Sequence, residues 1–334
     1  MDTVRWDRMA RALARQGHQV DIVLNRPSGT FDAGENLRYV SSGEMHWQDY
    51  DVIKTEFHHG FEHLERLGGA DHPFIISKLG SVVGSEDGQE GVYFFGEERR
   101  QLFELQQRIA RQARYVSILT QESIELWQRE HGASDRVLFV PTGVDRELPA
   151  LGNNPFADSK DKIAVYIGNI YDRETQPEIN ELWQRRMNSI GQRLQGSGVR
   201  LVMIGPGDAG FLDPAVVDYL GPIDNRLIYD YMQNADVGLV LAQGEIQHNE
   251  SSKLYELIRC GVPVVSEAPV PNNHILEECN WGSVANYRDD DAIAAQLITA
   301  AKSPQSPNSA VNHILNYHTW DHRAAVYAEL FNSE

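Results

Sequence analysis

The sequence has few cysteines, no long apolar run and too few basic residues to balance its acidic ones. Cys260 and Cys279 are the two cysteines among 334 residues, too few for a disulfide framework and typical of a reducing compartment. No apolar run approaches the ~20 residues that span a bilayer. The charged start of the chain, MDTVRWDRMARALARQ, lacks the apolar centre of a secretion signal. We therefore expect a cytoplasmic protein without a transmembrane segment.

The charge balance argues against nucleic acid as a partner. The chain has 30 Lys and Arg residues against 48 Asp and Glu residues, which gives a formal net charge of −18. Such a chain has no general attraction to a polyphosphate backbone or to anionic lipid headgroups. A local basic patch is still compatible with this composition, so peripheral contact with the inner face of a membrane stays open.

The length and the order of local patterns indicate two domains of α/β type. The 334 residues exceed one ordinary core and suit two domains of ~150 residues each. In both halves, short β-branched runs alternate with helical patterns, as in parallel sheets covered by helices. A turn-rich stretch with three prolines and two adjacent asparagines, residues 141–161, separates the halves. We place the domains at residues 1–148 and 149–318.

The expected helices and strands follow from the periodicity of apolar residues and from the positions of glycine and proline, which end such elements. In the first half we expect strands at residues 20–24, 37–40, 51–55, 74–77, 116–119 and 136–140, and helices at 3–16, 60–67, 97–113 and 122–130. In the second half we expect strands at 162–169, 199–205, 236–242 and 262–267, and helices at 178–194, 225–234, 252–260, 290–301 and 320–331. The Gly-rich, acidic residues 80–96 predict a long loop of the kind that is functional or mobile.

The segment GPGDAG, residues 205–210, matches the pattern G-x-G-x-x-G directly after an expected strand. In dinucleotide-binding proteins the third glycine opens a helix that carries the pyrophosphate at its N-terminus. Here the residues Phe-Leu-Asp-Pro follow and delay any helix. We therefore favour a turn over a dehydrogenase fingerprint.

The most informative stretch is HNESSKLYELIRCGVPVVSE, residues 248–267. A polar loop enters a helix whose first turn carries Ser251, Ser252 and Lys253, and free backbone N–H groups, hydroxyls and an ammonium together suit a diphosphate. Glu256 lies one turn beyond Lys253, so its carboxylate shares that face and suits a ribose diol. The same residues also fit an N-capped helix with a purely structural role. The pattern alone does not choose between these interpretations.

Five motifs in a fixed order resemble those of one enzyme family. They are RVLFVPTGVDREL (136–148), IAVYIGNIYDRE (163–174), VRLVMIGPGD (199–208), VDYLGPIDNRLIYDYMQNADVGLVLA (217–242) and SKLYELIRCGVPVVSE (252–267). Each motif is loose by itself, but their order and spacing are similar to glycosyltransferases of the GT-B fold, family four and its relatives. The resemblance implies two Rossmann-like domains with parallel sheets and a cleft between them.

The resemblance continues at both ends of the chain. The segment VRWDRMARALARQGHQVDIVL, residues 4–24, is similar to the family's first helix and second strand. In the family, a further strand and a Gly-rich loop precede this helix, so we expect the first strand of the N-terminal domain to be missing here. After the sequence Thr319-Trp320-Asp321, the resemblance implies that a last helix of about 319–332 packs back on the first domain.

For the donor site, the resemblance implies a nucleoside-diphosphate sugar, a UDP- or GDP-sugar, bound without metal or another cofactor. It places Arg173 and Lys253 on the diphosphate and Glu256 on the ribose. The supporting residues implied are Gly168 and Asn169 in the first phosphate loop and Ser251 and Ser252 at the helix start. The implied activity is that of a hexosyltransferase acting on an acceptor hydroxyl, in polysaccharide or glycoconjugate biosynthesis.

The catalytic residues depart from the family pattern. The first member of the family's E-x7-E pair falls on His248, and either His248 or Glu250 is expected to face the sugar ring. The family's first-domain histidine falls nearest Leu79, so inversion of configuration would need another base, such as Glu86. The acceptor stays open among a glycan, a lipid-linked molecule and a small molecule. A non-catalytic nucleotide-sugar-binding protein and a nucleotide-sugar epimerase remain as alternatives.

Overall fold

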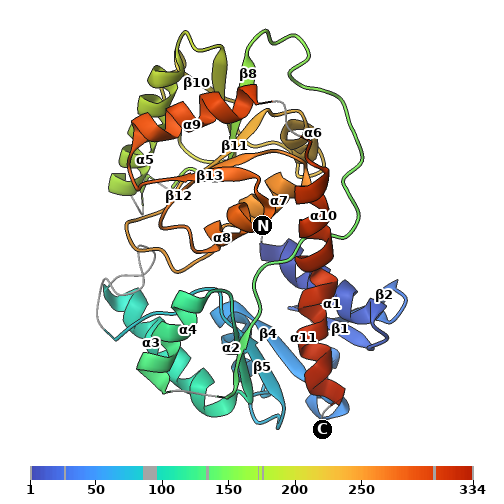
Figure 1. Ribbon diagram of the computed structural model, residues 1–334. Coiled ribbons are helices and arrows are strands. Elements are labelled where there is room, and N and C mark those ends of the chain that lie inside the picture. The colour runs from blue at the N-terminus through green and yellow to red at the C-terminus, as the bar shows by residue number, and fades with distance from the viewer. Residues whose placement is uncertain are drawn as a thin grey trace. The chain divides into compact units, whose positions relative to one another are not determined.

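The computed structural model describes residues 2–25, 28–85, 96–132, 135–171, 173–174, 177–303 and 306–332. The chain forms two compact units (Figure 1). The N-terminal unit comprises Met1–Arg146, Ile246–Glu250 and Tyr317–Glu334, and the C-terminal unit comprises Glu147–Glu245 and Ser251–Asn316. Among the described residues, no helix has the length and apolarity needed to cross a membrane.

The C-terminal unit is built on one six-stranded sheet in the order β10-β9-β8-β11-β12-β13. All its strand pairs are parallel. The strands are β8 (Lys162–Ile167), β9 (Val199–Ile204), β10 (Val217–Tyr219), β11 (Val237–Val240), β12 (Val264–Glu267) and β13 (Gly282–Ala285). The central strands are continuous apolar runs because helices cover both faces of a parallel sheet.

Two groups of helices cover this sheet. On one face, α5 (Pro177–Leu194) and α9 (Asp290–Lys302) pack side by side (Figure 1), and Trp183, Met187 and Leu297 enter the core with them. The other helices of this unit are α6 (Ile228–Gln233), α7 (Ser252–Arg259), α8 (His274–Cys279) and α10 (Asn308–Tyr317). Of these, α7 packs against β11 and β12.

The N-terminal unit contains two separate sheets, with strand orders β1-β3-β2 and β4-β5-β6-β7. Only the β2–β3 pair is antiparallel among the described pairs of this unit. The strands are β1 (Val20–Leu24), β2 (Phe31–Gly34), β3 (Leu37–Ser41), β4 (Ile53–Glu56), β5 (Ile75–Lys78), β6 (Tyr115–Ile118) and β7 (Val137–Phe139). The helices are α1 (Asp2–Arg15), α2 (Phe57–Arg66), α3 (Gly96–Gln112), α4 (Gln121–His131) and α11 (Trp320–Asn332).

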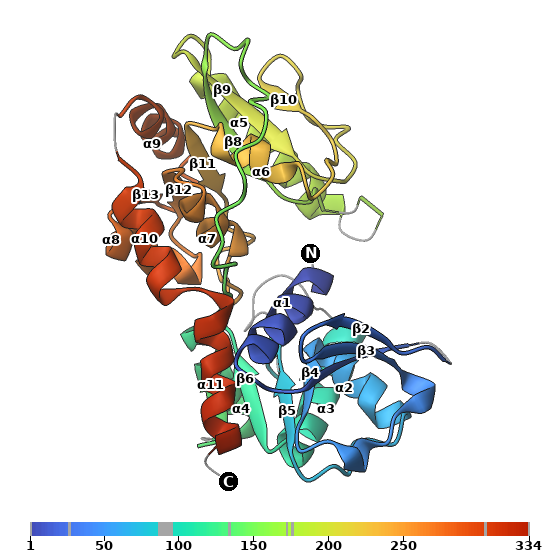
Figure 2. The ribbon, with the colours of Figure 1, turned by 90° about the vertical axis from the view of Figure 1, so that its right-hand side faces the viewer.

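The last helix, α11, packs on α1 within the N-terminal unit (Figure 2). Tyr327 is fully buried, and its hydroxyl donates a hydrogen bond of 2.8 Å to Ser117 Oγ on β6. Arg15 at the end of α1 forms an ion pair of 2.7 Å with Asp321. The first and last helices therefore share one apolar core with the β4–β7 sheet.

Most expected elements form within a few residues of their expected bounds, with a few corrections. Helix α6 begins at Ile228 rather than at 225, because the Asp224 side chain accepts a hydrogen bond of 2.9 Å from the Arg226 N–H and holds a turn there. The strands β2, β10 and β13 and the helices α8 and α10 were not expected. They are short and partly polar, which leaves little periodicity to detect.

The segment GPGDAG forms a turn, as expected, and the next helix after it is α6. Gly205 has a φ of +152°, and a Cβ there would lie 1.9 Å from the carbonyl oxygen of Gly168. Gly207 has a φ of +135°, and its Cβ would lie 2.6 Å from the Ile170 side chain. Both glycines are required by the close approach of the segment that follows β8.

We predict that Gly205→Ala strongly destabilises the protein, whereas Gly196→Ala does so only mildly. Gly196 also has a positive φ, +73°, but a Cβ there meets nothing within 4 Å. Backbone strain alone costs about 1–2 kcal/mol, and the collision with Gly168 adds to it. Urea unfolding of the two variants measures the difference. Equal losses would contradict the close approach of the two segments.

Candidate active site

The candidate donor site lies in the C-terminal unit, at the carboxyl ends of its parallel strands. In such sheets ligands bind outside these ends. Gly168 directly follows β8 and is buried. A Cβ at Gly168 would lie 3.0 Å from Lys253 Cε and 2.8 Å from Tyr166 Oη. The structure thus brings Lys253, near the start of α7, against the loop that the sequence assigns to phosphate binding.

The start of α7 is held by a side chain rather than capped by its own serine. The Ser251 N–H donates a hydrogen bond of 2.9 Å to Asn272 Oδ1, and Asn272 Nδ2 donates one of 3.0 Å to the Ser251 carbonyl. The Ser251 hydroxyl makes no capping bond. The Ser251 side chain therefore does not cap α7, although the structural interpretation of this segment expected it to. The neighbouring Ser252 opens the helix and is half-buried.

Arg173 is placed by the loop after β9. Its Nη1 lies 3.3 Å from Asp208 Oδ2, and its guanidinium lies 4.9 Å from the centre of the Phe211 ring. The side chains of Arg173 and Asp208 are 54% and 48% exposed. Exposed pairs of this kind contribute little stability, so a phosphate can replace the aspartate without great cost. Asn169 is also exposed.

Glu256 forms an ion pair with Arg259. Glu256 Oε2 lies 2.8 Å from Arg259 Nη2 on the next turn of α7. Arg259 is buried, donates a hydrogen bond of 3.1 Å to the Glu147 carbonyl and lies 5.1 Å from the centre of the Tyr229 ring. This fixed guanidinium orients the carboxylate of Glu256. The assignment of Glu256 to a ribose stays a prediction.

His248 and Glu250 lie in the N-terminal unit, although the sequence places them within the second domain, 149–318. The His248 carbonyl accepts hydrogen bonds of 2.6 Å from Thr120 Oγ1 and 3.2 Å from Ser123 Oγ. Glu250 accepts a hydrogen bond from the Thr142 N–H. These bonds explain why residues 246–250 group with the N-terminal unit. Their roles toward a sugar stay predictions, and Glu86 lies outside the described residues.

The surroundings of the His248 imidazole favour its neutral form through a lowered pKa. Burial lowers its pKa, and the nearby Arg129 lowers it further. Its Nδ1 atom is buried without a hydrogen-bond partner in the described part of the chain. A neutral, unsatisfied imidazole is available to accept or donate one bond to a ligand.

A buried charge network in the C-terminal unit was not singled out from the sequence. Arg186 on α5 forms a bidentate pair with Glu267 at the end of β12, with distances of 2.7 and 3.1 Å, and lies 2.8 Å from Asp290. Glu267 is fully buried and also accepts backbone N–H bonds from Ala242 (2.7 Å) and Arg288 (2.8 Å). Burial opposes the charge of Arg186, but the bonds to both carboxylates outweigh it and raise the pKa of Arg186. The sequence signal that could have indicated this network is Glu267, a charged residue at the end of an otherwise apolar strand.

A second charged cluster lies at the carboxyl ends of β4 and β5 in the N-terminal unit. Lys54 and Lys78 flank Glu56, with Lys78 Nζ 3.7 Å from Glu56 Oε2. Burial lowers the pKa of Lys78 to about 8, although Glu56 opposes the shift. The next residue after β4, Phe57, has a φ of +57° and its ring lies 4.3 Å from Lys78 Nζ. Strain in a bulky residue and a buried amine are both typical of functional sites.

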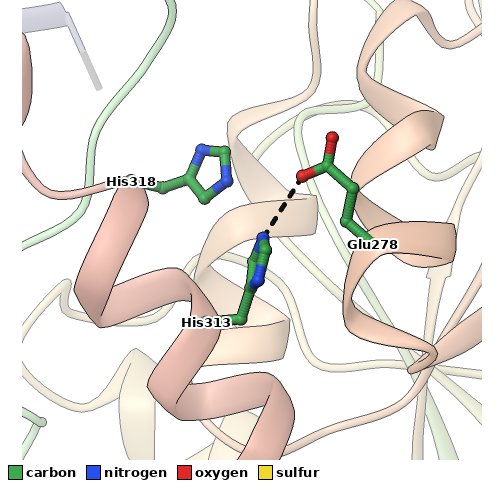
Figure 3. A group of neighbouring side chains, drawn as sticks. All are labelled: Glu278, His313 and His318. Atoms are coloured by element: carbon green, nitrogen blue, oxygen red, sulfur yellow. Dashed lines mark hydrogen bonds and ion pairs between the residues drawn. The ribbon is translucent and has the colours of Figure 1, made fainter.

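Glu278 on α8 and His313 on α10 form a separate pair in the C-terminal unit (Figure 3), with His313 Nε2 3.2 Å from Glu278 Oε2. The third residue drawn, His318, belongs to the N-terminal unit, where its Nδ1 lies 2.8 Å from Arg323 Nη2. The Glu278–His313 pair joins two helices of the C-terminal unit.

The sequence matches a known family over part of its length. Residues 180–329 match the family model described as "Glycosyl transferase-like". This region includes β9, the helix α7 with Lys253 and Glu256, and most of α11. No curated protein matches the sequence significantly.

Solved structures match 89–100% of the chain. The sucrose-phosphate synthase of Thermosynechococcus elongatus is 13% identical, with a TM-score of 0.71 over 100% of this chain and 94% of that one. The Anabaena protein HepE, solved with UDP and glucose, is 12% identical, with a TM-score of 0.67 over 89% and 86%. An α,α-trehalose-phosphate synthase (UDP-forming) of Burkholderia vietnamiensis is 14% identical, with a TM-score of 0.69 over 97% and 96%.

The fold and the family match agree on the class of this protein. At these identities the structural likeness establishes the fold, which is GT-B, with two Rossmann-like units built on parallel sheets. Residues 180–329, somewhat less than half of the chain, match the model of a glycosyl transferase-like family. The chain therefore has the GT-B fold and matches a glycosyl transferase-like family over residues 180–329, and the resemblance drawn from the five motifs is confirmed.

We predict that Arg186→Met destabilises the C-terminal unit by about 3–5 kcal/mol, because Glu267 would be left as a buried, unpaired charge. The adjacent Arg185→Met is the control, since Arg185 is 69% exposed in its pair with Glu181 and should lose less than about 1 kcal/mol. Denaturant unfolding with matched m-values measures both. If the two variants unfold at the same denaturant concentration, the network does not hold α5 to the end of β12.

Proposed function

We propose that this protein transfers a hexosyl group from a nucleoside-diphosphate sugar to an acceptor hydroxyl. The observation that carries the proposal is the contact of Lys253, at the start of α7, with Gly168 at the end of β8. An ammonium, a helix start and a glycine loop meet there at the edge where α/β sheets bind ligands. We propose a UDP-sugar ahead of a GDP-sugar, because two of the similar structures carry UDP in their names.

The proposed chemistry requires stabilisation of the departing diphosphate. The bond between the anomeric carbon and the diphosphate oxygen breaks, and a bond to the acceptor oxygen forms as the acceptor loses its proton. Lys253, the first N–H groups of α7 and Arg173 would neutralise the diphosphate without a metal ion. Glu256, oriented by Arg259 at 2.8 Å, would accept hydrogen bonds from the ribose.

The acceptor would be a glycan, a lipid-linked molecule or a small molecule in cytoplasmic polysaccharide or glycoconjugate synthesis. The proposed sugar-facing groups are His248 and Glu250, whose loop is bound to the N-terminal unit through Thr120 and Thr142. A neutral His248, which its lowered pKa supports, would donate a hydrogen bond to a sugar hydroxyl or accept one from it.

A second candidate function is nucleotide-sugar binding without turnover. It is favoured by Leu79, which occupies the position nearest the family's first-domain histidine and is almost fully buried. A leucine can neither accept a proton nor contact a sugar hydroxyl by hydrogen bonding. Release of free nucleoside diphosphate in the presence of an acceptor separates the two functions, because pure binding releases none.

We predict that Lys253→Ala abolishes thermal stabilisation by the donor, whereas Lys162→Ala leaves it intact. Lys162 lies at the amino end of β8, whereas the predicted donor site lies at its carboxyl end. Lys162 is paired with Asp236 at 2.8 Å. At ~100 times its Kd, a UDP-sugar should stabilise the wild type by ~2.7 kcal/mol. Differential scanning fluorimetry with UDP- and GDP-sugars measures this. Equal shifts in both variants would refute the donor site.

We predict that Arg173→Ala lowers kcat/KM by roughly ten- to a hundred-fold, the range expected for one lost hydrogen bond to a charged group. Its stability should be unchanged, since Arg173 is half-exposed. Arg226→Ala is the control, because Arg226 is 88% exposed and forms a surface ion pair with Asp224. Coupled detection of released nucleoside diphosphate measures both. Normal turnover in Arg173→Ala would remove it from the mechanism.

A further inference from the structure

The strand β8 carries a tyrosine whose ring and hydroxyl lie in different surroundings. Tyr166 is 7% exposed, and its ring lies in the core of the C-terminal unit, 4.8 Å from the centre of the Trp183 ring. Its hydroxyl lies near the carboxyl end of the strand, because a Cβ at Gly168 would be 2.8 Å from Tyr166 Oη. The ring therefore belongs to the core, while its polar end reaches the edge where α/β sheets bind ligands.

The Tyr166 hydroxyl and the Lys253 side chain lie against the same glycine. The Cβ position at Gly168 that is 2.8 Å from Tyr166 Oη is also 3.0 Å from Lys253 Cε. Tyr166 comes from β8 and Lys253 from the first turn of α7, so two elements bring a side chain to one point. A phenol hydroxyl and an ammonium are both hydrogen-bond donors, and here they can serve one ligand beside Gly168.

The packing of the ring does not explain why the residue is a tyrosine. Buried tyrosine hydroxyls usually have a hydrogen-bond partner, as Tyr327 has in Ser117 at 2.8 Å. Within the described part of the chain, the Tyr166 hydroxyl forms no hydrogen bond. Burial of a hydroxyl without a partner costs free energy. A phenylalanine would fill the same place against Trp183 without that cost, so the oxygen needs a reason outside the core.

The hydroxyl keeps its proton at neutral pH and is therefore a donor there. Burial raises the pKa of Tyr166, and the negative charge of Glu267 raises it further. A protonated phenol beside the Lys253 ammonium favours a ligand with anionic oxygens, because hydrogen bonds to charged acceptors are the stronger ones. The diphosphate of a nucleotide sugar offers such oxygens.

We propose that Tyr166 is a further donor-binding residue, whose hydroxyl donates a hydrogen bond to the diphosphate beside Gly168, together with Lys253. The inference rests on the proposed function and adds to it a residue that no charge or loop motif indicates. In the sequence, Tyr166 is one residue of the apolar run IAVYI, and that pattern predicts a buried strand without a binding role.

The test removes one oxygen atom and leaves the aromatic ring in place. Tyr166→Phe keeps the packing on Trp183 and deletes the hydroxyl alone. The matched control is Tyr327→Phe, which also deletes a buried hydroxyl, but one that has a protein partner in the N-terminal unit. Isothermal titration calorimetry with UDP, UDP-glucose, GDP and GDP-mannose, and the Tm without ligand, are measured for the wild type and both variants.

We expect opposite results from the two variants. Tyr166→Phe should weaken the binding of the nucleoside diphosphate and of its sugar alike, by roughly ten-fold or more, as for the loss of a hydrogen bond to a charged group. Its Tm without ligand should stay within about 1 °C of the wild type, because no hydrogen bond within the protein is lost. Tyr327→Phe should bind like the wild type and lose roughly 2–4 °C in Tm.

Three results would overturn the inference while the proposed function stands. The first is wild-type affinity in Tyr166→Phe. The second is a loss confined to the sugar-bearing ligands, because the hydroxyl would then bond to the sugar. The third is a Tm of Tyr166→Phe as low as that of Tyr327→Phe, because the hydroxyl would then have a partner within the protein. If the wild type binds none of the four ligands, the proposed function itself fails, and this inference fails with it.

Discussion

The buried bidentate pair of Arg186 and Glu267 holds together the part of the molecule on which the donor site depends. It links α5 on one face of the sheet to the end of β12, and Glu267 also binds the backbone after β11 through Ala242. A buried pair of this kind adds little net stability, but the loss of one partner is severe. The pair therefore serves to fix the positions of the carboxyl ends of β11 and β12. The loop that follows β11 leads into α7, which carries Lys253.

The site itself depends on small residues as much as on charged ones. Lys253 reaches the phosphate loop because Gly168 has no side chain. The loop after β8 can approach the end of β9 because Gly205 has none either. Charged groups provide the chemistry of a diphosphate site, while the absence of side chains brings them within reach of the same ligand.

The fold could be predicted from the sequence because its signals are local. Continuous apolar runs such as β8 and β9 and amphipathic helices such as α5 carry their periodicity within a few residues. The division of the N-terminal strands between two sheets depends on how β1 and β4 are placed in space, which no local pattern records.

The site could be predicted only where its residues share one helix or one loop. Lys253 was assigned to phosphate from its place in the first turn of a helix, and the structure sets it against Gly168. Glu256 pairs with Arg259 on the same helix, and the burial of that guanidinium depends on how α7 is rotated against its neighbours. The clusters around Glu267 and Lys78 join elements that are separated in sequence, so only the three-dimensional arrangement shows them.

The packing of α11 on α1 also sets the order in which the protein is completed during its synthesis. Arg15 and Asp321, which pair across these helices, are 306 residues apart, and Tyr327 bonds to Ser117 across 210 residues. A ribosome that adds about 5–20 residues per second needs roughly 15–60 s to span the longer interval. The core between α1 and α11 cannot close before the whole C-terminal unit has been made. The unit that is translated first is therefore finished last, and the nascent N-terminal unit exposes Met9, Ala12 and Leu13 throughout that time.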